Sequence, residues 1–99
     1  MSGPAPEFHV EREACASRED FLRQLRLVFP DCVLSGEGAA TIADGRATLE
    51  ITLTPLEPRT IALLTLPRLK VSLRGTAGKD QELAALLARM DLAMRRGGG

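Results

Sequence analysis

Residues 47–54 alternate strictly between apolar and polar side chains, and this alternation constrains the fold more than any other feature of the chain. The apolar members are Ala47, Leu49, Ile51 and Leu53, and the polar members are Thr48, Glu50, Thr52 and Thr54. Because successive side chains of a strand point to opposite faces, one face of this strand is buried and the other is solvated. The pattern therefore predicts an antiparallel sheet with one apolar face.

Five further segments have a strand signature, and turn residues separate most of them. The predicted strands cover 7–13, 32–35, 39–43, 60–66 and 68–74, in addition to 47–54. Asp44-Gly45 is a two-residue hairpin signal, since both central positions of such a turn need a positive φ. With this turn we expect Ile42 opposite Ala47 on the apolar face. The proline-rich segment 55–58 is predicted to be the next turn.

Two segments have helical spacing instead. Ser17 is a suitable cap for a first helix, and Pro30 ends it, because a proline disfavours the helical conformation in the residue before it. The second helix begins near Asp80 and ends at Gly97. Its apolar stripe, spaced to face a core, consists of Leu83, Leu86, Leu87, Met90 and Met94.

These elements predict an α+β fold in which the C-terminal helix packs across an antiparallel meander sheet. The order is β-α-β4-α if Pro67 bends one strand, and β-α-β5-α if it separates two. We expect one domain over residues 7–96, with a flexible leader at 1–6 and a flexible glycine tail at 97–99. The order of elements resembles the TATA-binding-protein-like and helix-grip folds, where a long C-terminal helix lies across a curved sheet.

Charge and composition argue against several classes of function. The 13 basic and 13 acidic residues cancel, so the basic surplus expected of a nucleic-acid binder is missing. Two cysteines without CxxC spacing and one histidine do not make a four-ligand zinc site. The start has no secretory signal pattern, and no apolar run approaches membrane-spanning length. We expect a cytoplasmic protein with reduced thiols, no cofactor and no membrane partner.

A few side chains are weak candidates for chemistry or for anion binding. Cys15 lies just before the first helix, whose N-terminus would lower a thiol pKa, and His9 is the one side chain that titrates near neutral pH unaided. A thiol-dependent enzyme would need both together. Arg68, Lys70 and Arg74 form a basic row that would suit phosphate, but no aromatic residues accompany it for base stacking. A solvated strand face explains the row equally well.

The segment Thr60–Leu66 (TIALLTL) is the most informative for function, because both faces of a strand with this sequence are apolar. Such a strand is either covered on both faces, for example by the first helix, or lies at an interface. The leading hypothesis is a non-enzymatic interaction domain that self-associates, as a homo-oligomer, through Ile61, Leu63, Leu64 and Leu66. The alternative is a small apolar-ligand binder, whose pocket between sheet and C-terminal helix is lined by Leu83, Leu87, Met90 and Met94.

Overall fold

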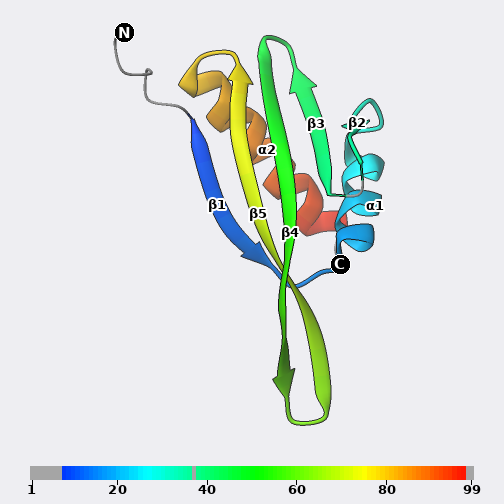
Figure 1. Ribbon diagram of the computed structural model, residues 1–99. Helices are drawn as coiled ribbons and strands as arrows, with labels where there is room; N and C mark the ends of the chain where they lie inside the picture. The colour runs from blue at the N-terminus through cyan, green and yellow to red at the C-terminus, as the bar shows by residue number, and fades with distance from the viewer. Residues whose placement is uncertain (1–7, 37, 98–99) are drawn as a thin grey trace, which may run out of the picture.

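The alternating segments form one five-stranded antiparallel sheet, and two helices cover one of its faces (Figure 1). The computed structural model describes residues 8–36 and 38–97. The elements are β1 (His9–Ala14), α1 (Arg18–Val28), β2 (Val33–Leu34), β3 (Ala39–Asp44), β4 (Ala47–Ile61), β5 (Leu64–Ala77) and α2 (Asp80–Gly97). The strands are ordered β1-β5-β4-β3-β2 across the sheet. The predicted α+β class is confirmed, with four strands between the helices. The predicted leader and the last two glycines lie outside the described residues.

The first helix begins and ends where its sequence predicts. Ser17 is the N-cap, and its hydroxyl oxygen accepts a hydrogen bond from the backbone N–H of Asp20 at 3.1 Å. This contact satisfies one of the N–H groups that a helix start leaves without a partner. The helix ends at Val28, two residues before Pro30.

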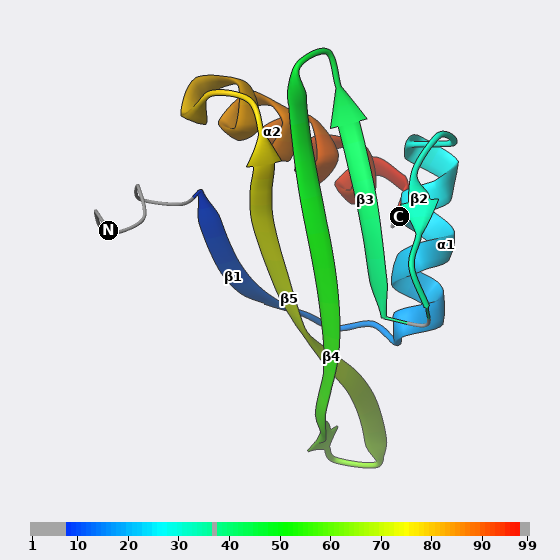
Figure 2. The same cartoon turned by 45° about the horizontal axis from the view of Figure 1, so that its top comes forward.

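The core lies between the sheet and the two helices, with α2 running across the covered face (Figure 2). The buried side chains of the sheet are Ala40, Ile42, Ala47, Leu49, Ile51, Leu53, Leu69, Val71 and Leu73. Those of the helical layer are Phe21, Leu25, Phe29, Leu83, Leu86, Leu87 and Met90. Within the described ranges no polar or charged residue is fully buried. The core is therefore almost wholly aliphatic, in agreement with the aromatic content of 3%.

The register of the β3–β4 hairpin differs from the predicted one by two residues. Ile42 lies opposite Leu49, and Asp44 pairs with Ala47. The turn is therefore Gly45-Arg46, with Gly45 at φ +62°. Glycine occupies the first turn position because that position needs the positive φ, which leaves the aspartate as the last residue of β3. A shift of two preserves the faces, so the predicted buried set is unchanged.

The largest departure from the sequence prediction is the segment 55–58, which is not a turn. β4 continues through it to Ile61, the chain turns at Ala62 and Leu63, and β5 begins at Leu64. The register shifts between Leu56 and Arg59, where Glu57 and Pro58 lie opposite the single residue Pro67. This bulge accommodates both prolines inside one long hairpin.

Beyond the body of the domain, β4 and β5 project as a two-stranded ribbon, which we call the arm (residues 55–67; Figures 1 and 2). The arm helps to make the molecule elongated, with extents of 51 × 32 × 23 Å. No other described strand pairs with the arm. The N–H groups that its prolines lack are therefore not needed by a neighbouring strand.

Candidate protein-interaction site

The end of the arm carries three apolar side chains that no other described part of the chain covers. Ile61, Leu63 and Leu64 are 51%, 100% and 64% exposed. Ile61 pairs with Leu64, and Thr60 pairs with Thr65. Residues directly opposite each other share a face, so one face of the ribbon is apolar and the other carries threonine. The turn falls inside the apolar run, and this is why the run is not apolar on both faces as its sequence predicts.

Leu66 belongs to the same face as Ile61 and Leu64, since it pairs with Arg59 at the next alternate position. Its side chain is half-buried. The four residues predicted as an interface are thus brought together at the end of the arm. The first helix does not cover them, although burial under it was the alternative explanation of their sequence.

The turn at the end of the arm has an unusual residue for its geometry. Ala62 has φ +54°, and it is the one residue other than glycine with a positive φ in the described part of the chain. A side chain at such a position normally costs about 1–2 kcal/mol, so glycine or asparagine is preferred there. The turn instead contains Ala62 followed by a fully exposed leucine.

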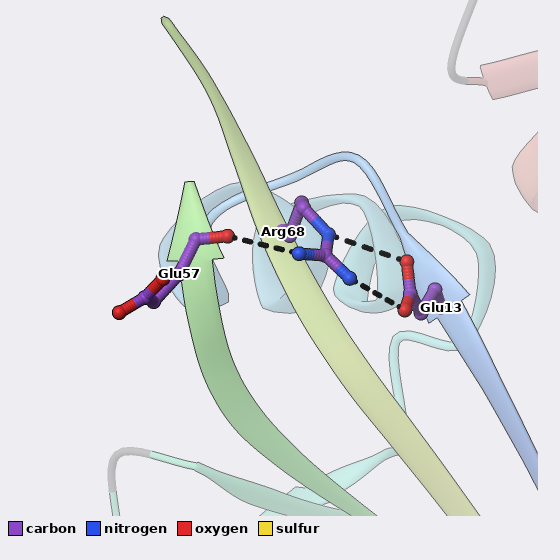
Figure 3. A network of polar contacts seen from close by, with 3 residues as sticks. All are labelled: Glu13, Glu57 and Arg68. Carbon is purple, nitrogen blue, oxygen red and sulfur yellow. Dashed lines mark hydrogen bonds and ion pairs between the residues drawn. The ribbon is translucent and has the colours of Figure 1, made fainter. Parts of the chain in front are cut away.

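Arg68 holds the base of the arm against the edge strand β1 (Figure 3). Its Nη2 and Nε donate to the two carboxylate oxygens of Glu13, at 2.7 and 3.3 Å. Its Nη1 donates to the backbone carbonyl of Glu57 in the bulge, at 3.2 Å. The hydrogen bond from Arg68, together with the charges of Arg68 and Arg59, lowers the pKa of Glu13. One guanidinium therefore joins β1, β5 and the bulge of β4.

A second apolar surface lies between α1 and β2. Leu27 is 74% exposed and Leu34 is 40% exposed. With Leu22 and Pro30 they line an open groove of about 660 Å³, whose remaining residues are Glu19, Arg23 and Arg26. We call this surface the α1–β2 groove. The sequence did not predict this groove. Leu27 lies outside the main apolar stripe of α1, so it resembles a single surface leucine.

The predicted basic row is matched by carboxylates from neighbouring strands. Lys70 lies 3.4 Å from Glu11 on β1, and Arg74 lies 3.0 Å from Glu50 on β4. Arg68 is paired with Glu13 as described above. The three cations therefore lie in a mixed-charge sheet face rather than in a positive patch. Binding of an anion by this row remains a prediction that no contact in the structure favours.

The two candidate catalytic side chains lie at opposite ends of β1. His9 begins this strand and Cys15 follows its last residue, roughly 20 Å away along an extended chain. The His9 Nε2 atom is 2.8 Å from the Ser72 hydroxyl oxygen. Both residues lie on the open face of the sheet, where we interpret the contact as a cross-strand hydrogen bond. The sequence did not predict the contact between His9 and Ser72, because the pairing of β1 with β5 was not predicted.

The apolar stripe of α2 mostly packs directly on the sheet. Leu83, Leu87 and Met90 are at most 8% exposed, and Met94 is partly buried beside them. Of the four predicted pocket residues, the two methionines line an open hollow of about 430 Å³ between β1, α1 and α2. The other lining residues are Arg12, Ala14, Cys15, Ala16, Phe21, Gln24, Val71, Asp91 and Arg95.

Cys15 is exposed and Cys32 is half-buried, and both are free thiols. Over residues 8–36 and 38–97, the structure has no cluster of three or more His, Cys, Asp or Glu side chains that could hold a metal ion. None of the described helices combines the length and apolarity needed to cross a membrane.

Comparison with protein-family models, with curated proteins and with solved structures finds no match for this chain. The similarity of its element order to the TATA-binding-protein-like and helix-grip folds therefore stays an analogy. The geometry of the arm and of the α1–β2 groove is the basis for the functional inference that follows.

Proposed function

We propose that this chain is a non-enzymatic interaction domain that uses its arm to associate with a protein surface, and that it self-associates in this way. The observation that carries the proposal is the exposure of Ile61, Leu63 and Leu64 together at the end of a projecting hairpin. Single exposed leucines are ordinary on protein surfaces, but several gathered on one projection are typical of interaction sites.

The energetics of the arm support this role. Burying an exposed leucine side chain contributes about 1.5–3 kcal/mol, so the arm residues have a substantial free energy to gain from a partner. Three prolines, at positions 55, 58 and 67, lack the N–H groups that an added strand would need. Prolines on exposed strands also deter uncontrolled pairing between chains. The arm is therefore suited to contact through its side chains rather than to extension of the sheet.

Sedimentation velocity over the micromolar range tests the proposal. We expect the wild-type chain to be oligomeric and the Leu63→Asp variant to be monomeric, because the charge would be buried in the interface. Leu92→Asp is the matched control, since Leu92 is 50% exposed and belongs to α2 rather than to the arm. It should leave association unchanged. A wild-type chain that stays monomeric throughout this range would contradict self-association.

Removal of the arm provides a second test. Replacing residues 57–67 by Asn-Gly would close β4 and β5 with a two-residue turn between Leu56 and Arg68, which already pair. The shortened chain should retain a cooperative unfolding transition, because the buried core residues lie outside the deleted segment. It should also sediment as a monomer. An arm-less chain that still associates would place the interface elsewhere.

The open hollow beside Met90 and Met94 supports a second candidate function, binding of a small apolar molecule. Its volume falls in the range of small-molecule sites, and two arginines line it: Arg95, and Arg12, whose Nη1 lies 2.6 Å from Asp91. An amphipathic carboxylate would suit this combination. Titration with a medium-chain fatty acid should shift the methyl NMR signals of both methionines. Unchanged methionine signals at saturating ligand would eliminate this function.

A further inference from the structure

We infer that the arm binds in the α1–β2 groove of a second copy of this chain, so that two copies exchange arms about a two-fold axis. This inference rests on the proposed function, because it identifies the partner of the same arm. Its starting point is the positions of Leu63 and Leu27, the two most exposed leucines in the described part of the chain. Leu63 lies on the projecting arm, and Leu27 borders the groove.

The two surfaces are complementary in shape and chemistry. The arm offers a narrow ribbon with an apolar end, and the groove is lined by Leu22 and Leu27 on α1 and by Leu34 on the two-residue edge strand β2. Both signs of charge are present on each side, with Glu57 and Arg59 on the arm and glutamate and arginine at the groove. Polar groups around an apolar centre are the usual anatomy of a protein interface.

The lengths of the two surfaces also agree. From Pro55 to Ile61, the outgoing strand of the arm spans roughly 20 Å. The 11-residue helix α1, which forms one wall of the groove, spans roughly 16 Å. An arm laid along this helix would place its end residues over the groove without protruding far beyond it.

A dimer with two-fold symmetry needs only these two surfaces, the arm and the groove. A two-fold axis through the midpoint between arm end and groove, perpendicular to the line that joins them, carries each onto the position of the other. Every arm then meets a groove, and no arm or groove is left over to recruit a third chain. A closed dimer is the expected product, rather than an open fibre.

The area that must be buried favours exchange over a contact between two arms. Stable interfaces bury about 1,200 Å² or more in total. Two arm ends facing each other would bury only the exposed parts of Ile61, Leu63 and Leu64 on each copy. That area is on the order of a few hundred Å², if a fully buried side chain of this size corresponds to roughly 100 Å². Exchange buries two arms and two grooves, which brings the total toward the range of stable dimers.

Cross-linking with a short bismaleimide tests the geometry of the contact. The experiment uses a background in which Cys15→Ser and Cys32→Ala remove the native thiols. We expect a covalent dimer when a Leu63→Cys chain is mixed with a Leu27→Cys chain, because the arm of one then reaches the groove of the other. Leu92→Cys replaces Leu27→Cys in the control mixture, which should give no covalent dimer with Leu63→Cys.

The oligomeric state provides an independent reading. Leu27→Asp and Leu63→Asp should each lower the population of the dimer by at least tenfold at a fixed micromolar concentration. Mixing the two variants should restore part of it, since a mixed dimer retains one intact arm and one intact groove. Neither substitution should affect the fold, because both leucines are largely exposed.

The outcomes separate this inference from the proposed function. Cross-linking of Leu63→Cys chains with each other alone would show that arms meet arms, which overturns exchange while the arm remains the interface. Association that depends on Leu63 but not on Leu27 would overturn it in the same way. A wild-type chain that is monomeric, or whose association ignores Leu63, would overturn both.

Discussion

β4 and β5 each pass through two environments, and the two halves of this hairpin form an internal comparison. In the body of the domain, Leu49 and Ile51 on β4 and Leu73 on β5 are fully buried. In the arm, Ile61 and Leu64 on the same two strands are more than half exposed. Both halves are antiparallel, and the helices cover the body of the sheet but not the end of the arm. Strand pairing satisfies the backbone in both halves, whereas burial of side chains requires the second layer.

Prolines mark the transition between the two halves. Within the described strands, Pro55, Pro58 and Pro67 all lie in the arm, and the body segments have none. In the body, β4 and β5 have neighbours on both sides, so every N–H is needed for a ladder. In the arm, the outer edges have no neighbour, and a missing N–H costs little. The position of prolines along a long hairpin therefore reports where the sheet ends.

The sharpest test of this comparison is truncation of matched leucines on β5. Leu73→Ala should lower the free energy of unfolding by about 2–5 kcal/mol, because it opens a cavity under the helices. Leu64→Ala should change it by no more than about 0.5 kcal/mol, since its side chain is already solvated. Urea denaturation in a Leu63→Asp background, which we expect to be monomeric, measures both. Equal losses would mean that the arm is packed in the monomer.

A substitution in the turn at the end of the arm should change stability by a smaller amount, and should raise it rather than lower it. Ala62→Gly relieves a positive φ and should stabilise the paired form of the arm by roughly 1 kcal/mol. Slower amide exchange of the arm residues would report this gain. Ala43→Gly is the control, since Ala43 lies in β3 without a positive φ, and it should destabilise the chain by roughly 0.5–1 kcal/mol. Faster exchange in the Ala62→Gly arm would contradict the observed turn geometry.

Loss of the Arg68–Glu13 ion pair at the base of the arm should have the smallest effect on stability, and this effect should depend on pH. Arg68 lowers the pKa of Glu13, so this pair stabilises the folded state above the pKa that Glu13 has in the unfolded chain. The stabilisation is lost as the pH falls through the lowered folded-state value. Glu13→Gln should therefore slightly reduce stability at neutral pH and have no effect in strong acid.

A double-mutant cycle isolates this contribution from other acid-sensitive groups. In an Arg68→Met background, Glu13→Gln should alter the urea midpoint at neutral pH less than it does in the wild-type chain, because the charge of Arg59 remains. Both partners are solvent-exposed, so the coupling is small and is reduced by salt. A coupling that persists unchanged in acid would contradict the assigned pair.

Local patterns predicted the body of the domain well. The alternation over 47–54, the stripe of α2 and the cap at Ser17 each report burial or hydrogen bonding within a few residues, and each is confirmed. The segment 55–58 misled because prolines usually end a strand, whereas here they lie in a ribbon whose outer edges are free. The β3–β4 register was missed by two residues because both placements keep the same apolar face inward.

Long-range pairing limited prediction of the candidate site. The sequence indicated Ile61–Leu66 as apolar, but its exposure depends on where the helices lie, which no local pattern reports. The Arg68–Glu13 contact required the pairing of β1 with β5. A signal was present, since β1 carries glutamates on the face where β5 carries Lys70 and Arg68. Opposite charges on alternating positions of two strands favour their pairing.

The pairing of β1 with β5 also determines when this domain is able to fold during its synthesis. His9 pairs with Arg74, so β1 must wait for β5, the last of the described strands. The partners within the arm are close neighbours in sequence, so their pairing closes a shorter loop and costs less entropy. We therefore expect β1 to join the sheet late in folding and to leave one edge of β5 unpaired until then. That edge, rather than the finished surface, is where a chaperone would be needed.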